Sequence, residues 1–346
     1  MSSLQTEQSD TTFIMKYNTF YQYRLATMTA TEPRSRKKVA IVTGASSGMG
    51  EALTRDLVSR GWWVAMADIQ EKKTLSVDMG PRARFFHTDV SSYDSQAATF
   101  QAVFNQRGRI DALCANAGIC DKSSLYIFDH RQSTAIPPAP DTSCTDVDWK
   151  GVVYGTQLAI HFMRQNKPRP GGVIVATASV AAMHPHPAYC EYNGAKAAVV
   201  NFVRGMAPVL RAKEGIRINA VMPGIVDTAI VPPEIAAAAG RENITPISTI
   251  TRAYNQLLEN EKASGVILEG SVDKIIRVPD PPLLNGSRTK RAVTVYDPLF
   301  KYLHGEESRL QDAVKGEDLK WEPRAVSKPK RSRSRIWRAL RSGCKS

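Results

Sequence analysis

A tyrosine and a lysine, Tyr192 and Lys196, are spaced for acid–base chemistry in this sequence. Residues four apart share one face of a helix, so the phenol and the ammonium are expected to be neighbours. A phenol with a pKa of about 10 is a poor base at neutral pH, and a nearby ammonium favours its ionised form. The spacing alone is weak evidence, because many helices contain it by chance. Ser179 strengthens it, since a serine ending an expected strand thirteen residues before Tyr192 can donate a hydrogen bond to a substrate oxygen.

A glycine-rich turn, TGASSGMG at residues 43–50, directly follows the first expected strand. Between a strand and a helix, such a turn lets the main chain approach a pyrophosphate while the helix N-terminus faces the negative charge. The G-x-x-x-G-x-G spacing differs from the G-x-G-x-x-G of the general dinucleotide fingerprint. The position of the turn nevertheless predicts a dinucleotide site. Its expected cofactor-binding residues are Gly44, Ser46, Ser47, Gly48, Met49 and Gly50.

An acidic residue, Asp68, ends the second expected strand eighteen residues after Gly50. A carboxylate there can accept hydrogen bonds from the adenosine ribose hydroxyls, and it repels a 2′-phosphate. Neither Ser47 nor Ile69 supplies a base that would bind such a phosphate. The sequence therefore favours NAD over NADP. The alternative for Asp68 is a helix N-cap.

Short β-branched runs alternate with longer amphipathic segments from residue 38 onward. The runs are continuously apolar, which is typical of strands buried on both faces of a parallel sheet. The alternation predicts a doubly wound, Rossmann-like α/β fold with about seven strands flanked by helices. The expected strands are 38–43, 63–68, 84–89, 111–118, 173–179, 216–224 and, at the sheet edge, 265–270. The expected helices are 48–60, 94–107, 147–166, 190–213 and 250–263.

Several short motifs occur together in this chain. They are TGASSGMG (43–50), Asp89 with Val90, ANAG (115–118), Ser179, YNGAK (192–196) and PGIVDT (223–228). Their order and spacing resemble the short-chain dehydrogenase/reductase family, in its single-domain branch, over residues 37–270. Together they are far more specific than any one of them.

The resemblance implies the roles of the catalytic candidates. Tyr192 would exchange a proton with the substrate oxygen, while Ser179 polarises that oxygen. Lys196 would lower the pKa of Tyr192 and hold the nicotinamide ribose, so that Tyr192 and Lys196 also line the cofactor site. Hydride transfer of this kind needs no metal.

The same resemblance implies further cofactor contacts. Asp89 would lie beside the adenine, and Asn116 would brace the central strand near the cofactor. Pro223, Gly224 and Thr228 would flank the nicotinamide carboxamide. The remaining expected contacts are Val90, Ala117, Gly118 and Val226.

One position departs from the family pattern. The family usually carries an asparagine in the helix before a V-x-x-G segment, where it anchors a water that relays protons from the lysine. Aligning GVVYGT (151–156) places Asp148 there, which adds a negative charge near Lys196. We expect the relay to be altered rather than absent. The stretch 148–165 is also similar to 15-hydroxyprostaglandin dehydrogenase-like members, including fungal ones.

The positive charge of the chain is concentrated at its C-terminal end. The 346 residues carry a formal net charge of +13, and residues 320–346 alone contain ten Lys or Arg and one acid, Glu322. The excess belongs to a tail, so no specific nucleic-acid partner is expected for the body. Solvated disorder, contact with an anionic membrane and a nucleic-acid or localisation signal are the alternatives for the tail.

The cysteine content and the hydropathy of the chain indicate its cellular compartment. Five cysteines, an odd number without C-x-x-C spacing, argue against a disulfide framework or a zinc site. No apolar run approaches the roughly 18–20 residues of a membrane span. We therefore expect a cytoplasmic protein. Its expected segments are a disordered extension (1–36), an NAD-binding short-chain dehydrogenase domain (37–285), an irregular segment (286–320) and a basic disordered tail (321–346).

The leading hypothesis is an NAD(H)-dependent oxidoreductase that interconverts a secondary alcohol and its ketone. The apolar, irregular segment 231–250 lies where the family builds a substrate lid, which suits a hydrophobic substrate. The alternatives are an NADPH-dependent carbonyl reductase of secondary metabolism and a non-catalytic dinucleotide-binding scaffold with a basic docking tail. The resemblance also implies a homodimer or homotetramer that associates through 147–166 and 190–213.

Overall fold

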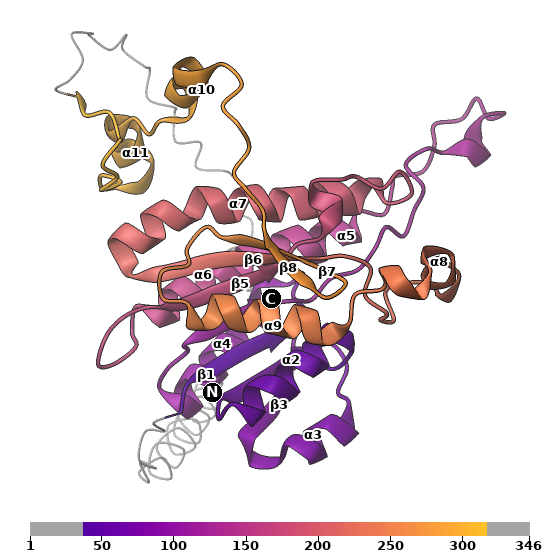
Figure 1. Cartoon of the computed structure of the whole chain (residues 1–346), viewed down its shortest axis with the longest axis horizontal. Helices are drawn as coiled ribbons and strands as arrows, with labels where there is room; N and C mark the ends of the chain where they lie inside the picture. The colour runs from indigo at the N-terminus through magenta and orange to yellow at the C-terminus, as the bar shows by residue number, and fades with distance from the viewer. Residues whose placement is uncertain (1–36, 317–346) are drawn as a thin grey trace, which may run out of the picture. The chain divides into compact units, whose positions relative to one another are not determined.

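Eight strands form one sheet in the computed structural model, which describes residues 37–316 of the chain (Figure 1). The strand order is β3-β2-β1-β4-β5-β6-β7-β8. The pairs from β3 to β7 are parallel, whereas β8 is antiparallel to β7. The chain winds outward in opposite directions from β1 and β4, which confirms the expected Rossmann-like, doubly wound fold. The strands are β1 (Val39–Thr43), β2 (Trp63–Asp68), β3 (Ala83–His87), β4 (Ala112–Ala115), β5 (Gly172–Thr177), β6 (Ile216–Pro223), β7 (Ile267–Ser271) and β8 (Lys274–Arg277).

Helices cover both faces of this sheet (Figure 1). Successive residues of β1 point to opposite faces, so Ile41 joins a core with α4, α6 and α7, while Val42 joins a core with α2, α3 and α9. Phe162 of α6 and Tyr254 of α9 are among the large side chains buried in these two cores. The helices are α2 (Gly48–Ser59), α3 (Lys73–Met79), α4 (Tyr93–Arg107), α5 (Ser143–Thr145), α6 (Gly151–Met163), α7 (Cys190–Glu214), α8 (Pro233–Ala239), α9 (Ile247–Glu259), α10 (Gly286–Val293) and α11 (Asp297–His304).

The edge of the sheet differs from the expectation. The seventh strand was expected at the edge, but β7 is paired on both sides, with β6 and β8. The chain reverses between Ser271 and Lys274 through Val272, which has a positive φ of 52°. That conformation is unusual for a β-branched residue. The strand β8 has only four residues and is mostly exposed, so it lacks the apolar run that signals a strand.

The helix expected over 147–166 has two parts. A π-helical turn, Asp146–Lys150, precedes α6 and carries Asp148. Such turns widen the helix locally and are frequent at functional sites. A long connection, residues 116–142, leads from β4 to this turn and lacks α-helix and strand.

A second compact unit begins at Leu283. Its described part, up to residue 316, contains α10 and α11, so the expectation of an irregular segment is wrong for these residues. Both helices have only eight residues, and Pro, Lys and Arg surround them, which hid them in the sequence. The expected extension 1–36 and the basic tail 321–346 lie outside the described residues. Within 37–316, no helix combines the length and the apolarity that a bilayer span requires.

Candidate active site

The carboxyl ends of the central parallel strands meet at one edge of the sheet, where ligands bind in open α/β folds. The glycine turn follows β1 there, Asp68 ends β2, and Asn116 follows β4. Ser179 lies just after β5, and Pro223 ends β6. The topology thus brings together residues that are up to 180 positions apart, because every one of them lies at a strand end.

The glycine turn leaves no room for side chains at two positions. A Cβ on Gly50 would lie 2.0 Å from the carbonyl oxygen of Gly44, and Gly44 itself has a φ of +64°. The helix α2 begins at Gly48, and Ser47 precedes it as the N-cap residue. Among the described residues, the Ser47 side chain accepts no capping hydrogen bond. The first-turn N–H groups therefore remain available to an anion. This close, amide-rich turn fits the pyrophosphate of a dinucleotide.

Asp68 holds the glycine turn against the end of β2. One carboxylate oxygen accepts a hydrogen bond from the Ser46 N–H at 3.0 Å, and the other accepts one from Gln70 N–H at 3.1 Å. The helix α3 begins at Lys73, so Asp68 is not its N-cap. The N-cap alternative is thereby wrong. The Asp68 carboxylate lies next to the glycine turn, where an adenosine ribose would lie in a dinucleotide-binding fold.

Asn116 braces the turn from the adjacent strand. Its main-chain N–H donates to the Thr43 hydroxyl at 2.9 Å, and its side-chain amide donates to the Thr43 carbonyl at 3.0 Å. The hydroxyl of Thr43 also accepts from Ala117 N–H at 3.0 Å. The hydroxyl of Thr177 donates to the amide oxygen of Asn116 at 3.3 Å. These contacts join the ends of β1, β4 and β5 through hydrogen bonds.

Two expected contacts on the adenine side have other partners. The side chain of Asp89 accepts hydrogen bonds from the N–H and hydroxyl of Ser91 at 2.9 and 2.7 Å. Val90 is buried and packs beside Gly151, since a Cβ on that glycine would lie 3.2 Å from it. The carbonyl of Val90 accepts a buried hydrogen bond from the Gln96 side-chain amide at 2.7 Å.

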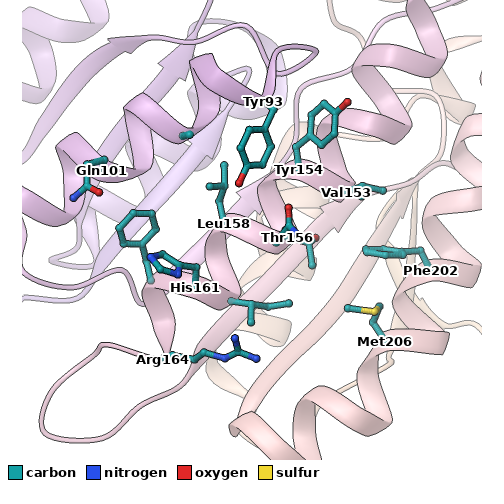
Figure 2. A pocket seen from close by; sticks show the side chains of 14 residues that line it. Tyr93, Gln101, Val153, Tyr154, Thr156, Leu158, His161, Arg164, Phe202 and Met206 are labelled. Atoms are coloured by element: carbon teal, nitrogen blue, oxygen red, sulfur yellow. The ribbon is translucent and has the colours of Figure 1, made fainter. Parts of the chain in front are cut away.

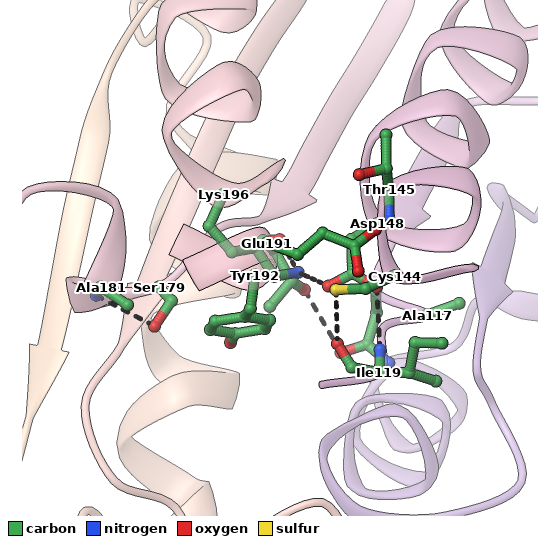
Figure 3. Close-up of polar contacts among 12 residues, drawn as sticks. Ala117, Ile119, Cys144, Thr145, Asp148, Ser179, Ala181, Glu191, Tyr192 and Lys196 are labelled. Atoms are coloured by element: carbon green, nitrogen blue, oxygen red, sulfur yellow. Dashed lines mark hydrogen bonds and ion pairs between the residues drawn. The ribbon is translucent and has the colours of Figure 1, made fainter. Parts of the chain in front are cut away.

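The catalytic candidates and the nicotinamide-side residues line one cavity of about 70 Å³. The expected site residues that line it are Met49, Asn116, Gly118, Ser179, Tyr192, Lys196, Pro223, Gly224, Val226 and Thr228. In Figure 3 the ring of Tyr192 is drawn between Ser179 and the pair of Lys196 and Asp148. Val231, from the segment expected to form a lid, and the preceding Ile230 also line this cavity with apolar side chains.

The surroundings of Tyr192 shift the pKa of its hydroxyl in opposing directions. Burial raises the pKa of Tyr192, while the Lys196 ammonium and the Ser179 hydroxyl oppose that rise. The Lys196 ammonium lies 5.4 Å from the centre of the Tyr192 ring and donates a hydrogen bond to the Thr177 carbonyl at 2.9 Å. The net direction is upward, and Asp148 contributes to it.

Asp148 forms a buried ion pair with Lys196, as its sequence position suggested. The two atoms Oδ2 and Nζ are 3.0 Å apart, and both side chains are almost completely buried. The other oxygen of Asp148 accepts from Ile119 N–H at 2.8 Å. Burial raises the pKa of Asp148, whereas the carboxylate raises the pKa of Lys196 against the effect of burial.

Asp121 was not identified from the sequence. Its carboxylate accepts hydrogen bonds from the N–H groups of Glu191 and Tyr192 at 2.9 and 2.8 Å. The Asp121, Cys144 and Glu191 ligand atoms lie within 4.8 Å of one another, a spacing that could hold a metal ion. Each is already engaged, since Cys144 donates to the Ile119 carbonyl and Glu191 accepts from a main-chain N–H. Their visible role is to fasten the 116–142 connection to the start of α7.

The histidines before Tyr192 belong to a loop. His184 and His186 are exposed, and the ring of His186 accepts a hydrogen bond from Ala188 N–H at 3.1 Å. Tyr189 directly precedes α7, with its ring centre 6.5 Å from that of Tyr192. Four residues after Tyr189 the chain has Asn193 rather than a lysine.

A larger hollow of about 830 Å³ lies away from this edge, between α4, α6 and α7 (Figure 2). Its wall includes Tyr93, Tyr154, Phe202 and Met206. The rings of Tyr93 and Tyr154 meet edge to face, with centroids 5.6 Å apart. None of the catalytic candidates lines this hollow.

Comparisons with known proteins agree with this geometry. A family model described as short chain dehydrogenase matches residues 38–238. Short-chain dehydrogenase/reductase prx6 of Penicillium rubens is 52% identical over 298 residues, which cover 82% of this chain and 98% of that protein. The mouse (Mus musculus) 15-hydroxyprostaglandin dehydrogenase [NAD(+)] is 26% identical, over 70% of this chain and 93% of its own.

A solved structure supports the fold alone. The 3-ketoacyl-(acyl-carrier-protein) reductase from Brucella melitensis, complexed with NADH, has a TM-score of 0.59 at 24% identity, over 68% of this chain and 98% of that one. The family match extends from β1 to α8 and therefore includes the glycine turn, Ser179, Tyr192 and Lys196. This chain belongs to the short-chain dehydrogenase/reductase family of oxidoreductases.

Proposed function

We propose that this protein is an NAD(H)-dependent oxidoreductase that interconverts a secondary alcohol and its ketone. The observation that carries the proposal is the single cavity lined by Ser179, Tyr192 and Lys196 together with the nicotinamide-side residues. Bound nicotinamide supplies or accepts the hydride. Ser179 donates a hydrogen bond to the substrate oxygen, and Tyr192 gives or takes its proton. Lys196 stabilises the phenolate when it forms and lies where it can hold the nicotinamide ribose.

The preference for NAD rests on Asp68. Its carboxylate lies at the glycine turn through the Ser46 contact, and a 2′-phosphate beside it would meet like charge. The neighbouring Ile69 is 60% exposed and offers no positive group. The name of the mouse relative, which specifies NAD(+), is in line with this preference.

A hydrophobic substrate fits the walls of the cavity. Met49, Val226, Ile230 and Val231 supply apolar surface around the catalytic hydroxyls. Apolar walls with few polar groups are the usual composition of small-molecule sites. The name of the relative 15-hydroxyprostaglandin dehydrogenase denotes dehydrogenation of a hydroxyl group, which supports the same class of reaction here.

The decisive experiment is turnover of a panel of secondary alcohols and ketones, followed by NADH or NADPH absorbance. We expect activity with NAD(H), and Tyr192→Phe should reduce kcat by a factor of about 1,000 or more while cofactor binding persists. Tyr189→Phe is the matched control, because it removes a neighbouring phenol and should leave kcat within about twofold. Unchanged turnover in Tyr192→Phe would favour the scaffold alternative, and a preference for NADPH would favour the carbonyl reductase alternative.

The hollow between α4, α6 and α7 supports a homo-oligomer through these helices. Partly exposed apolar side chains such as Phe202 and Met206 line its wall, on helices that the family resemblance predicts to associate. Phe202→Glu should weaken association, which sedimentation velocity would detect as a shift to smaller species. An unchanged distribution would place the interface elsewhere.

A further inference from the structure

A buried carboxylate faces the lysine that should promote ionisation of Tyr192. Asp148 Oδ2 lies 3.0 Å from Lys196 Nζ, and the two side chains are 0% and 3% exposed. Within residues 37–316 this oxygen accepts no hydrogen bond, and the Lys196 ammonium is its ion-pair partner. A Cβ on Gly118 would lie 3.0 Å from Asp148 Oδ2 and 3.2 Å from Lys196 Nζ, so main chain covers the pair.

The other ionisable groups around the pair do not replace this charge. Cys120, on the 116–142 connection, and Cys144, on α5, both have a thiol pKa raised chiefly by burial, so they stay neutral near pH 7. Glu191 accepts from Thr145 N–H at 2.7 Å. Asp121 accepts from the two N–H groups at the start of α7. Asp148 is therefore the carboxylate in direct contact with the lysine.

An ammonium alone stabilises a neighbouring phenolate, but an ammonium paired with a carboxylate has no net charge. The pair is buried, where charges interact more strongly than in water. The carboxylate therefore cancels much of the benefit that Lys196 would give to an ionised Tyr192. The same carboxylate repels a phenolate directly, which acts in the same sense.

We propose that Asp148 is a positioning residue that acts through Lys196 to keep the proton on Tyr192, and so prepares this site for carbonyl reduction near neutral pH. The inference rests on the proposed function and adds the direction in which the reaction is favoured near neutral pH. In reduction the substrate carbon gains a hydride from reduced nicotinamide, and the substrate oxygen gains the proton of Tyr192. The phenolate left behind then takes a proton from water. Alcohol oxidation needs the ionised tyrosine at the start, so it becomes efficient only at higher pH.

The test is the pH dependence of kcat in both directions for the wild type and Asp148→Asn. The asparagine keeps the shape and an acceptor oxygen for Ile119 N–H, but it removes the charge. We expect the rising limb of oxidation and the falling limb of reduction both to move to lower pH, by on the order of one unit. At a pH below the midpoint, such a shift raises the initial rate of oxidation about tenfold. Asp146→Asn is the matched control, because Asp146 pairs with Lys150 at the surface of the same π-helical turn.

A second readout is independent of turnover. Near-ultraviolet absorbance titration of the phenolate, taken as the difference between each protein and its Tyr192→Phe counterpart, should show the same shift. Asp148→Ser gives a second uncharged variant if the asparagine protein folds poorly. Midpoints that stay in place or move to higher pH would overturn the role of Asp148. If Tyr192→Phe keeps full activity, the proposed function fails instead, so the two failures are distinguishable.

Discussion

The carboxylate of Asp121 accepts a hydrogen bond from the main-chain N–H of Tyr192 at 2.8 Å. The two residues are 71 positions apart, yet Asp121 takes the place of a local N-cap for α7. Tyr189, the residue before the helix, makes no side-chain capping bond among the described residues. The start of α7, and with it the position of Tyr192, is therefore fixed by the connection that follows β4.

Removing this contact should impair catalysis more than folding. We expect Asp121→Ala to lose about 1 kcal/mol of stability, as for other N-caps. A displacement of Tyr192 should lower kcat on the order of tenfold, with a smaller effect on KM. Steady-state kinetics and urea unfolding measure the two effects. Asp129→Ala, at an exposed position of the same connection, is the control. An unchanged kcat in Asp121→Ala would show that α7 holds Tyr192 without this cap.

The glycine turn should tolerate no side chain at Gly50. The new Cβ of Gly50→Ala would lie 2.0 Å from the Gly44 carbonyl oxygen, so the turn must open. We expect NADH affinity, measured by fluorescence titration, to fall by on the order of tenfold or more. Gly205→Ala is the control, because Gly205 lies within α7 with open space around it. That change should leave NADH binding intact and stabilise the helix by roughly 0.5–1 kcal/mol. Wild-type affinity in Gly50→Ala would mean that the cofactor does not contact this turn.

Cofactor choice should follow the charge at the end of β2. The double change Asp68→Ser with Ile69→Arg removes a carboxylate and adds a guanidinium that can bind a phosphate. We expect the ratio of kcat/KM for NAD over NADP to fall on the order of 100-fold. Ile69→Arg alone should give a smaller change, because Asp68 still repels the phosphate. A wild-type ratio in the double variant would place the selectivity elsewhere.

The unit that begins at Leu283 should weaken in acid. Hydrogen bonds from Lys315 and then from Ser308 lower the pKa of the Asp297 carboxyl to about 2. An unfolded aspartate has a pKa of about 4. As the pH falls, Asp297 therefore becomes protonated at a lower pH in the folded protein than in the unfolded chain. The stabilisation is therefore complete above about pH 4 and is lost as the pH falls towards 2.

Asp297→Asn tests this linkage. Lys315 is 45% exposed, so solvent screening limits the expected loss at neutral pH to on the order of 1 kcal/mol. Hydrogen exchange of the α11 amides should be faster in the variant at pH 7, and the difference should shrink towards pH 2. Asp312→Asn, at an exposed and more distant ion pair, should change little. A difference that persists unchanged in strong acid would contradict the linkage.

The sequence alone determined the fold class and identified most of the residues that the fold brings together at the candidate site. Three features lie at the ends of strands, namely the glycine turn, Asp68 and Ser179. The other two residues, Tyr192 and Lys196, lie one turn apart on the same helix. Those positions follow from local patterns, because every parallel strand of such a sheet delivers its carboxyl end to the same edge. The negative charge beside Lys196 was also predictable, since Asp148 precedes the V-x-x-G segment.

Only the tertiary structure decided the contacts between residues that are far apart in the sequence. The cap of α7 by Asp121 joins residues 71 positions apart through a connection without α-helix or strand, so no period in the sequence marks it. The distance between Asp148 and Lys196 depends on the π-helical turn, which a one-residue change in helix winding creates. The edge strand β8 is stabilised by pairing with β7 rather than by burial, and pairing partners are set by the folded chain.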